Sequence, residues 1–340
     1  MAEPNSPHYV EVDMTPSTAD ALVRRKLPKL SQVVQVEAIA VGWNNRCFSL
    51  TTADGCEYVL RVTKDTWPAS KIIAEAAGLA ALAHYKVDIP VPALIGYNAE
   101  VDPVLRVRWM LMVKMKGTML DAVWDAANDD ERAAIGAQIH KIHTELQNHR
   151  FDRIGGWIFD HPDNTTPVLG PFFEGYGPFN SEREWLQHKF DSQVLKATTN
   201  MALEALREYI PAATAIVKAY LSSMSECPVV LFHGDFAFRN MLVDHGVIVG
   251  ILDWEWCGAM PMWKEWGDVS FGDRHVYDYV PSFVYPNPAE LDSRQRLFQL
   301  IEAFSPWQMG CWPEKDATYA AGAKQTILAT LDFFSSQDRL

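Results

Sequence analysis

The segment from His233 to Trp256 reads HGDFAFRNMLVDHGVIVGILDWEW and sets polar side chains at intervals between apolar runs. The runs MLV and VIVGILD are typical of two strands, joined by a turn at Asp-His-Gly. Such a hairpin would hold Asn240, just before its first strand, beside Asp253, at the end of its second. Asp235 lies five residues before Asn240 in the same short loop. We therefore expect these three side chains to converge on one patch.

Two acids and an amide beside buried strands need partners. A buried carboxylate is tolerated only when it is ion-paired, hydrogen-bonded or bound to a metal. Mg²⁺ prefers hard oxygen ligands of this kind and leaves part of its shell to water and phosphates. The pattern therefore indicates that oxygens of these three side chains would suit a magnesium ion. The alternative is that the three residues only form turns, as Asp and Asn often do.

The composition is that of a globular chain with an acidic balance. Of its 340 residues 48% are apolar, and 43 acidic residues outnumber 30 basic ones, for a formal charge of −13. A chain of this length exceeds the usual size of a single core, which favours two packed regions. The charge argues against a protein that follows a nucleic-acid backbone, because that role needs clustered positive charge. It fits cationic or neutral small partners, and equally the ordinary solubility of an acidic protein.

The cysteines and the N-terminal residues bear on the compartment. The five cysteines are scattered and never spaced as C-x-x-C, which favours neither a disulfide framework nor a structural zinc site. The N-terminal stretch MAEPNSPHYVEVD lacks the basic and apolar regions of a secretory leader. No later stretch approaches the roughly 18 uninterrupted apolar residues of a membrane span. We therefore expect a cytoplasmic protein; the sequence does not predict an oligomeric state.

The first third of the chain predicts a sheet crossed by one helix. Segments 33–40, 47–63 and 106–115 have the composition of strands, and Asp54-Gly55 supplies a tight turn inside the second. Between them, residues 70–85 (SKIIAEAAGLAALAHY) have the Ala and Leu content of a helix, which a Pro-rich stretch ends.

One acid of this predicted helix lies on its apolar face. At about 100° per residue, Ile72, Glu75 and Leu79 fall in one narrow sector. An acid on a buried face needs a cation, and Arg61 on the preceding strand is the nearest candidate in sequence. We therefore expect an ion pair between Arg61 and Glu75, with a surface ion pair as the alternative.

Beyond Gly117 the pattern becomes mainly helical. Ile135, Ile139 and Ile142 recur on one face of a predicted helix over 129–146, and Ser181 with Glu184 forms a capping-box start for the next one. Between these two helices we expect a long loop over 161–180, rich in Pro, Gly and aromatic residues. Further helices are predicted near 201–223, 294–303 and 317–334.

The order D-x4-N, strand, turn, strand, D resembles the catalytic core that protein kinases share with small-molecule kinases. HGDFAFRN and ILDWEW are similar to the aminoglycoside phosphotransferase and choline kinase-like family, which has H-G-D-x4-N and I-x-D-W in place of H-R-D and D-F-G. The resemblance covers most of the chain and is most specific in residues 231–256. It implies an α+β, bilobal protein-kinase-like fold. A small antiparallel sheet lobe with one key helix (1–113) would bind nucleotide, and a larger, mainly helical lobe (114–340) would carry catalysis and the acceptor.

The resemblance also implies roles for individual residues. Asp235 would accept the proton of the acceptor hydroxyl, while Asn240 and Asp253 would hold Mg²⁺ against ATP. Arg61 stands where the family has a Lys or Arg that reaches the α- and β-phosphates, and Glu75 would be its partner.

Two further segments match the family's nucleotide site less closely. The stretch AVGWNNRCF, with Gly42, Asn44 and Asn45, stands where the phosphate-covering loop lies, but it has a single glycine. The stretch MLMVKMKG resembles the hinge that hydrogen-bonds adenine through its backbone, at Met112–Lys114. Val113 stands there where relatives often carry an acid. Met112, Val113 and Lys114 are thus expected nucleotide contacts.

The implied activity is ATP- and Mg²⁺-dependent transfer of a phosphoryl group to a hydroxyl of a small molecule. The acceptor could be an aminoglycoside-like amine, a choline-like alcohol, a sugar or a natural product, with contacts expected from loops 171–179 and 278–288. One alternative is a nucleotide-binding or interaction protein that keeps the fold without transfer activity. A protein kinase is disfavoured, because no A-P-E-like segment follows Asp253.

Several other residues admit a structural or a functional interpretation. We expect His233 to hold its loop through a backbone hydrogen bond rather than act as a base. His140 and His143, three residues apart, are expected to pack rather than bind a metal. A group of large side chains favours packing over an apolar acceptor site: Trp254, Trp256, Met260, Met262, Trp263 and Trp266. Glu265 lies near a position where relatives often have an acid.

Overall fold

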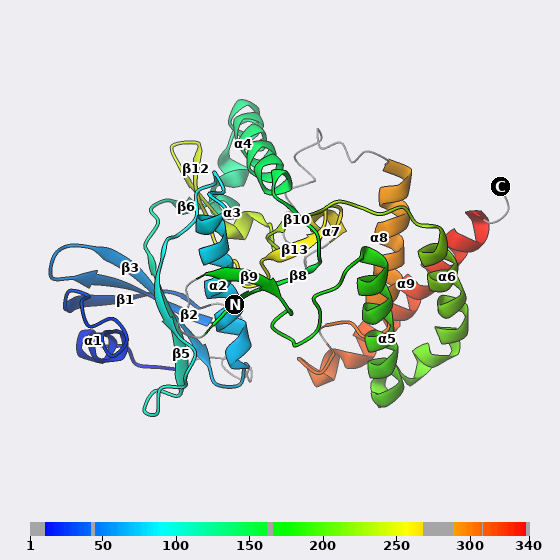
Figure 1. Ribbon diagram of the computed structural model, residues 1–340, viewed down its shortest axis with the longest axis horizontal. Helices are drawn as coiled ribbons and strands as arrows, with labels where there is room; N and C mark the ends of the chain where they lie inside the picture. Colours follow the sequence, from blue (N-terminus) through cyan, green and yellow to red (C-terminus); the bar gives the residue numbers. More distant parts are fainter. Residues whose placement is uncertain (1–10, 42–44, 162–165, 268–287, 308, 338–340) are drawn as a thin grey trace.

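The computed structural model describes residues 11–41, 45–161, 166–267, 288–307 and 309–337. Figure 1 shows a sheet-rich region at one end of the long axis, a group of long helices at the other, and smaller sheets between them. None of the helices in these ranges is both long and apolar enough to cross a membrane. All five cysteines are free thiols, as expected.

The N-terminal lobe is built on an antiparallel five-stranded sheet with the order β1-β2-β3-β5-β4. Its strands are β1 (Val33–Val41), β2 (Asn45–Thr52), β3 (Glu57–Lys64), β4 (Leu94–Asn98) and β5 (Val107–Val113). The expected turn at Asp54-Gly55 joins β2 to β3, with Gly55 at φ +83°. Arg61 lies on the central strand, opposite Cys47 on one side and Met110 on the other.

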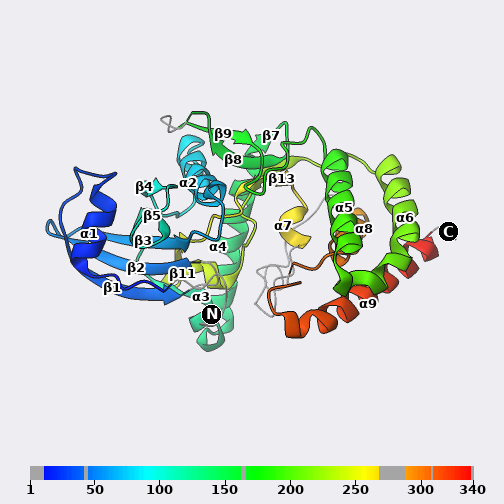
Figure 2. The same cartoon turned by 90° about the horizontal axis from the view of Figure 1, so that it is seen from below.

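Two helices pack on this sheet. Helix α2 (Ala69–His84) matches the helix predicted over 70–85. Helix α1 (Pro16–Arg24) was not predicted; the Thr15 side chain accepts a hydrogen bond from the Thr18 N–H, and Pro16 occupies the first turn. Its buried Leu22 and Val23 join the core on the outer side of the sheet. Figure 2 shows α1 at the end of the molecule opposite the long C-terminal helices, and α2 beside the smaller sheets in the middle.

The C-terminal lobe contains two small sheets, of which the β11–β12 hairpin was predicted from the sequence and the other strands were not. One sheet has the order β7-β10-β13-β8-β9 and the other β12-β11-β6. Their strands are β6 (Thr118–Met119), β7 (Arg150–Phe151), β8 (Gly155–Phe159), β9 (Pro167–Gly170), β10 (Val229–Phe232), β11 (Met241–Asp244), β12 (Val247–Ile251) and β13 (Gly258–Pro261). The prediction of a loop over 161–180 is therefore wrong in part, because strand β9 lies within this range and pairs with β8.

The longer helices of this lobe correspond to segments predicted to be helical, whereas two four-residue helices were not predicted. They are α3 (Leu120–Val123), α4 (Asp129–Asn148), α5 (Glu182–Thr199), α6 (Ile210–Ser223), α7 (Lys264–Gly267), α8 (Pro288–Ala303) and α9 (Asp316–Gln337). Short 3₁₀ helices are η1 (Trp124–Ala126), η2 (Met201–Tyr209), η3 (Phe238–Asn240) and η5 (Pro313–Lys315). The single helix expected near 201–223 is thus divided, because Pro211 lies in the first turn of α6 and cannot continue a preceding helix.

One hydrophobic cluster joins the two lobes, while a second lies within the C-terminal lobe and a third within the N-terminal lobe. Ile72 and Leu82 of α2 share one cluster with Trp157 and Trp254 of the C-terminal lobe. Gly78 allows this close approach: a Cβ there would lie 3.1 Å from the Cβ of Cys257. Helix α2 is therefore fixed against the segment that follows Asp253, which places its polar residues beside that aspartate.

Candidate active site

The β11–β12 hairpin positions two of the predicted metal ligands. Its turn uses His245 and Gly246, both at positive φ (47° and 77°). At its open end the N–H of Leu252 donates to the carbonyl oxygen of Asn240 at 2.8 Å. Asn240 and the residue before Asp253 are therefore neighbours, as the sequence pattern predicted.

Asp235 contacts Asn240 directly. The Nδ2 of Asn240 donates to Asp235 Oδ2 at 2.7 Å and to the Asp235 carbonyl oxygen at 2.8 Å. The other carboxylate oxygen, Oδ1, accepts a hydrogen bond from Arg239 Nη2. The amide nitrogen of Asn240 is thus engaged, and its amide oxygen is the atom that suits a cation. The carboxylate of Asp235 is held in one orientation at both oxygens.

His233 ties the Asp235 loop to the hairpin. Its imidazole is fully buried, and Nδ1 accepts from the Asp235 N–H at 3.0 Å. Nε2 must then carry the proton, which it donates to the carbonyl oxygen of Leu252 at 2.9 Å. Burial lowers the pKa of His233, which keeps the ring neutral. The expected role of His233 as a structural link is confirmed.

The backbone before Asp235 is fixed from a second direction. The carboxylate of Glu265, on α7, accepts the N–H of His233 at 2.7 Å and that of Gly234 at 3.0 Å. Gly234 has φ +91°, and a Cβ at this position would lie 2.4 Å from the Cβ of Trp256. Only glycine fits there, since both the backbone angle and the space exclude a side chain.

Asp253 combines a strained backbone with a buried acceptor atom. It has φ +65°, which is uncommon for a residue other than glycine and is often found at functional sites. Its Oδ1 is buried without a hydrogen bond, although Arg61 Nη2 lies 2.9 Å away. A carboxylate oxygen of this kind fits the oxygen ligands of Mg²⁺, as does the amide oxygen of Asn240. Within the described ranges, no three His, Cys, Asp or Glu residues form a metal-binding group.

Arg61 is the centre of a buried ionic network. Its guanidinium forms the expected ion pair with Glu75, and its Nη2 also lies 2.7 Å from Glu255 Oε2. Burial by itself would lower the pKa of Arg61, but the neighbouring carboxylates, first that of Glu75, raise it well above its usual value. Burial raises the pKa of Glu75 to about 7, against the opposing effect of Arg61.

Two members of this network, Glu255 and Lys71, were not predicted from the sequence. Lys71 Nζ lies 2.5 Å from Glu255 Oε2, and both side chains are buried. Glu255 follows Asp253 by two residues and lies in a turn, so its closeness in sequence to Asp253 was the available signal. Nothing in the sequence separated Lys71 from an ordinary exposed lysine at a helix start.

The predicted phosphate-loop and hinge residues are only partly described. Gly42 and Asn44 lie outside the described residues. Asn45 is buried at the start of β2, where its Oδ1 accepts from Thr63 Oγ1 at 2.6 Å. In the hinge segment, the N–H of Val113 donates to Ala93 O and that of Lys114 to Glu57 O. These two N–H groups are thus already paired within the N-terminal lobe, and Met112 lies in β5.

The other predicted residues divide between packing and exposure. Trp254, Trp263, Met260 and Met262 are buried, so the packing interpretation holds for them. Trp256 is 40% exposed and lies against Phe173, with 4.9 Å between ring centroids. Burial also lowers the pKa of His143 to about 3, which makes it a neutral packing residue. The side chain of Trp266 and nearly all of the 278–288 segment lie outside the described residues.

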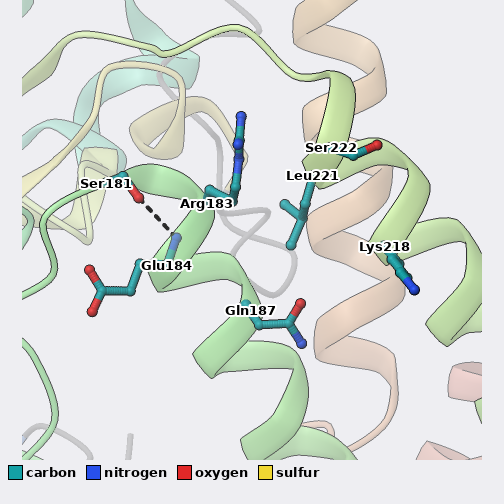
Figure 3. A pocket seen from close by; sticks show the side chains of 7 residues that line it. All are labelled: Ser181, Arg183, Glu184, Gln187, Lys218, Leu221 and Ser222. Atoms are coloured by element: carbon teal, nitrogen blue, oxygen red, sulfur yellow. Dashed lines mark hydrogen bonds between the residues drawn. The ribbon is translucent and has the colours of Figure 1, made fainter.

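A cavity of about 430 Å³ lies elsewhere, beside helices α5 and α6 (Figure 3). Its lining residues are Ser181, Arg183, Glu184, Gln187, Lys218, Leu221 and Ser222. Figure 3 shows Ser181 bonded to the N–H of Glu184, which is the expected helix cap. None of these residues takes part in the network around Arg61, so this cavity is not the candidate active site.

Comparisons with known proteins identify similar sequences and folds. The model of the phosphotransferase enzyme family matches residues 35–283. Two curated proteins, both named as subtelomeric hrmA-associated cluster proteins of Aspergillus fumigatus, are 24% identical to this chain over 153 residues. That match covers 44% of this chain, and the chain spans only 30% of the length of these relatives.

Solved structures are similar over almost the whole chain. A thermostable variant of aminoglycoside phosphotransferase APH(4)-Ia, in a ternary complex with AMP-PNP and hygromycin B, has a TM-score of 0.65 at 17% identity. The alignment covers 92% of this chain and 98% of that one. The complex of gentamicin with APH(2″)-IIa gives 0.62 at 14% identity, covering 94% and 97%. These matches confirm the predicted bilobal, protein-kinase-like fold.

Proposed function

The chain belongs to the phosphotransferase enzyme family, and on this premise we propose that it transfers the γ-phosphoryl group of ATP to a hydroxyl of a small molecule with the help of Mg²⁺. The observation that carries the proposal is the contact of Asp235 with Asn240, whose backbone in turn bonds the residue before Asp253. This arrangement supports the proposal because it would place a proton acceptor, an amide oxygen and a second carboxylate in one region.

The nucleotide side of the site is built around Arg61. Glu75 and Glu255 form ion pairs with its guanidinium, which is therefore held in place even when no ligand is bound. A guanidinium in this position would bind the phosphates of ATP through charge-assisted hydrogen bonds. Asn240 and Asp253 would hold Mg²⁺, which supplies neutralisation of the phosphate charge.

Asp235 would act on the acceptor. As the hydroxyl oxygen forms its bond to the γ-phosphorus, its proton passes to the Asp235 carboxylate, and the bond from phosphorus to the bridging oxygen breaks to release ADP. Arg239 and Asn240 hold Asp235 in place for this step. Catalysis in such transfers comes mostly from positioning and charge stabilisation, so a fixed carboxylate matters more than a strongly basic one.

The acceptor is proposed only as a class. Aminoglycosides are present in the similar structures, which favours polyhydroxylated amines as the first compounds to test. Choline-like alcohols, sugars and hydroxylated natural products remain candidates, because surface loops set the acceptor while the catalytic residues stay fixed. We expect the reaction to take place in the cytoplasm.

The test is a screen of hydroxylated compounds with ATP and Mg²⁺, in which mass spectrometry detects a product that has gained one phosphoryl group. Replacing Asp235 by Asn should lower the rate by roughly 10²-fold or more, because the proton acceptor is lost while the shape is kept. Asp244→Asn is the matched control, since Asp244 is an exposed acid of the same hairpin and should leave the rate unchanged.

Two other outcomes would support a different function. Binding of ATP without transfer to any compound of a broad panel would favour a nucleotide-binding protein that lacks transferase activity. Phosphorylation of peptides instead of small molecules would favour a protein kinase. An Asp235→Asn variant as active as the native protein would remove the assigned catalytic role.

A further inference from the structure

Lys71 is enclosed in an environment built for a cation. Its side chain is only 3% exposed, and its Nζ lies 2.5 Å from Glu255 Oε2. Three aromatic rings surround the same ammonium group, with centroids 5.0 Å (Trp67), 5.5 Å (Phe173) and 5.8 Å (Trp256) away. Lysine is rarely buried unless it is paired, and one carboxylate with three ring faces compensates the lost hydration.

This environment joins three segments that are distant in sequence. Trp67 precedes α2, Phe173 belongs to the loop over residues 171–176, and Trp256 follows Asp253. The hydroxyl of Ser70 donates to the carbonyl oxygen of Phe173 at 2.7 Å, and the Phe173 ring packs on Trp256. Loop 171–176 is therefore attached both to the start of α2 and to the segment beside Asp253.

Glu255 connects the lysine to the nucleotide side of the site. Its Oε2 accepts from Arg61 Nη2 at 2.7 Å and also contacts Lys71 Nζ. One carboxylate oxygen is thus shared by the two cations. Any movement of Lys71 changes the position or the charge balance of Glu255, and Arg61 responds because the low local dielectric makes such contacts strong.

The charges around Arg61 are unbalanced until Asp253 finds another partner. The two cations, Arg61 and Lys71, face three carboxylates, Glu75, Asp253 and Glu255. If Asp253 turns to a divalent cation, two cations remain for two carboxylates. Arg61 is then held by Glu75 and Glu255 alone, and Glu255 also contacts Lys71. Nucleotide with Mg²⁺ should therefore tighten the contacts that lead to Lys71.

Resting on the proposed function, we propose that Lys71 is a positioning residue that couples loop 171–176 to Arg61 through Glu255. Nucleotide binding at Arg61 then stabilises the loop, and an ordered loop strengthens nucleotide binding by the same factor, as linkage requires. Because the loop lies in a segment expected to contact the acceptor, the nucleotide-bound protein would present a preformed acceptor surface.

Hydrogen exchange of the loop amides measures this coupling without any acceptor. The loop is closed by hydrogen bonds from Phe172 N–H to Tyr176 O and from Gly175 N–H to Phe172 O. In the native protein, ADP with Mg²⁺ should slow the exchange of both amides. Lys71→Met keeps an unbranched apolar side chain among the rings but removes the charge. It should abolish this protection and weaken ADP binding roughly tenfold in calorimetry.

Three further variants separate positioning from general stability. Lys71→Arg keeps the charge and should restore both the protection and the affinity. Lys324→Met removes another lysine with a carboxylate and a ring beside it, Glu208 at 3.3 Å and the Tyr209 ring centroid at 5.3 Å, and should change neither. Phe173→Leu removes the aromatic ring that the loop places beside Lys71 and should also abolish the protection. If Lys71→Met does not fold, the result for Phe173→Leu tests the coupling instead.

The outcomes for this inference and for the proposed function can be told apart. If Lys71→Met, or Phe173→Leu in its place, keeps the native protection by ADP and Mg²⁺, the coupling is refuted while the transferase proposal stands. If the native protein does not bind ADP with Mg²⁺, the proposed function fails and the coupling fails with it.

Discussion

Arg61 Nη2 lies 2.9 Å from Asp253 Oδ1, so the central strand of the N-terminal sheet meets the end of the β11–β12 hairpin in one ion pair. The Arg61 side chain is 8% exposed and that of Asp253 35%. Glu75 and Glu255, which are both buried, also contact the same guanidinium. Of the three carboxylates, that of Asp253 is the most exposed. It can therefore separate from Arg61 at the lowest cost in free energy, because water already solvates part of it.

Asp253→Asn should leave the fold as stable as the native protein. The substitution removes one of three carboxylates that face two cations, and Asn tolerates the left-handed backbone angle at this position. Binding of ADP should lose its dependence on Mg²⁺, because a neutral amide is a weaker ligand than a carboxylate. Urea unfolding and calorimetry with and without Mg²⁺ measure the two effects. A large loss of stability with metal-dependent binding intact would contradict this account of Asp253.

Glu255→Gln, in contrast to Asp253→Asn, should lower the stability of the fold. It leaves Lys71 buried without the carboxylate that it contacts, and breaking a buried ion pair costs about 3 kcal/mol or more. Urea unfolding measures the difference. A surface pair gives the control: Asp292→Asn removes the partner of Arg296, whose side chain is 39% exposed, and should cost less than about 1 kcal/mol. Equal effects of Glu255→Gln and Asp292→Asn would show that the buried network does not stabilise the fold.

Gly234→Ala should disrupt the loop that holds Asp235 beyond the effect of backbone strain. Its Cβ would lie 2.4 Å from the Cβ of Trp256, whereas a Cβ on Gly246, also at positive φ, meets nothing within 4 Å. Gly246→Ala should therefore cost about 1 kcal/mol from strain alone, and Gly234→Ala about 3 kcal/mol. Unfolding free energies of both variants provide the test, and equal losses would exclude the steric contribution.

His143 should contribute a loss of stability below neutral pH. Burial lowers its pKa from 6.5 to about 3, so the stability that the neutral ring contributes is present above pH 6.5 and is lost as the pH falls towards 3. Between pH 6.5 and pH 5 this contribution should fall by about 2 kcal/mol. Glu75 acts in the opposite direction, because its raised pKa of about 7 favours the folded state as the pH falls. The difference in unfolding free energy between the native protein and His143→Gln, taken at several pH values, therefore measures the contribution of His143.

Two substitutions isolate this histidine. His143→Gln removes the titrating group and should lose about 2 kcal/mol less stability than the native protein over that interval. His245→Gln should leave the native slope unchanged, because the His245 side chain is 96% exposed. The same slope in His143→Gln as in the native protein would assign the acid sensitivity to other groups.

The parts of the site that could be predicted from the sequence are those with a local pattern. The hairpin at 241–251 and the inward face of α2 follow from periodicity and turn residues, and these place Asn240, Asp253 and Glu75. Helix-forming segments beyond residue 117 were also evident, because their apolar residues recur at helical spacing.

The missed features depend on contacts between distant segments. Strand β7 is two residues long and β13 is four, which is too short to show a pattern. They form by pairing with β10 and, for β13, also with β8. The burial of Lys71 depends on Phe173 and Trp256, which no periodicity of α2 reveals. In the hinge, the pairing of the Val113 and Lys114 N–H groups likewise comes from neighbouring strands.

The most direct measurement is an anomalous difference map from crystals grown with ADP and Mn²⁺ in place of Mg²⁺. The account predicts a metal peak in coordinating contact with the amide oxygen of Asn240 and the carboxylate of Asp253, on the phosphate side of Arg61 and next to Asp235. A map in which ADP is bound but the metal contacts neither Asn240 nor Asp253 would contradict it.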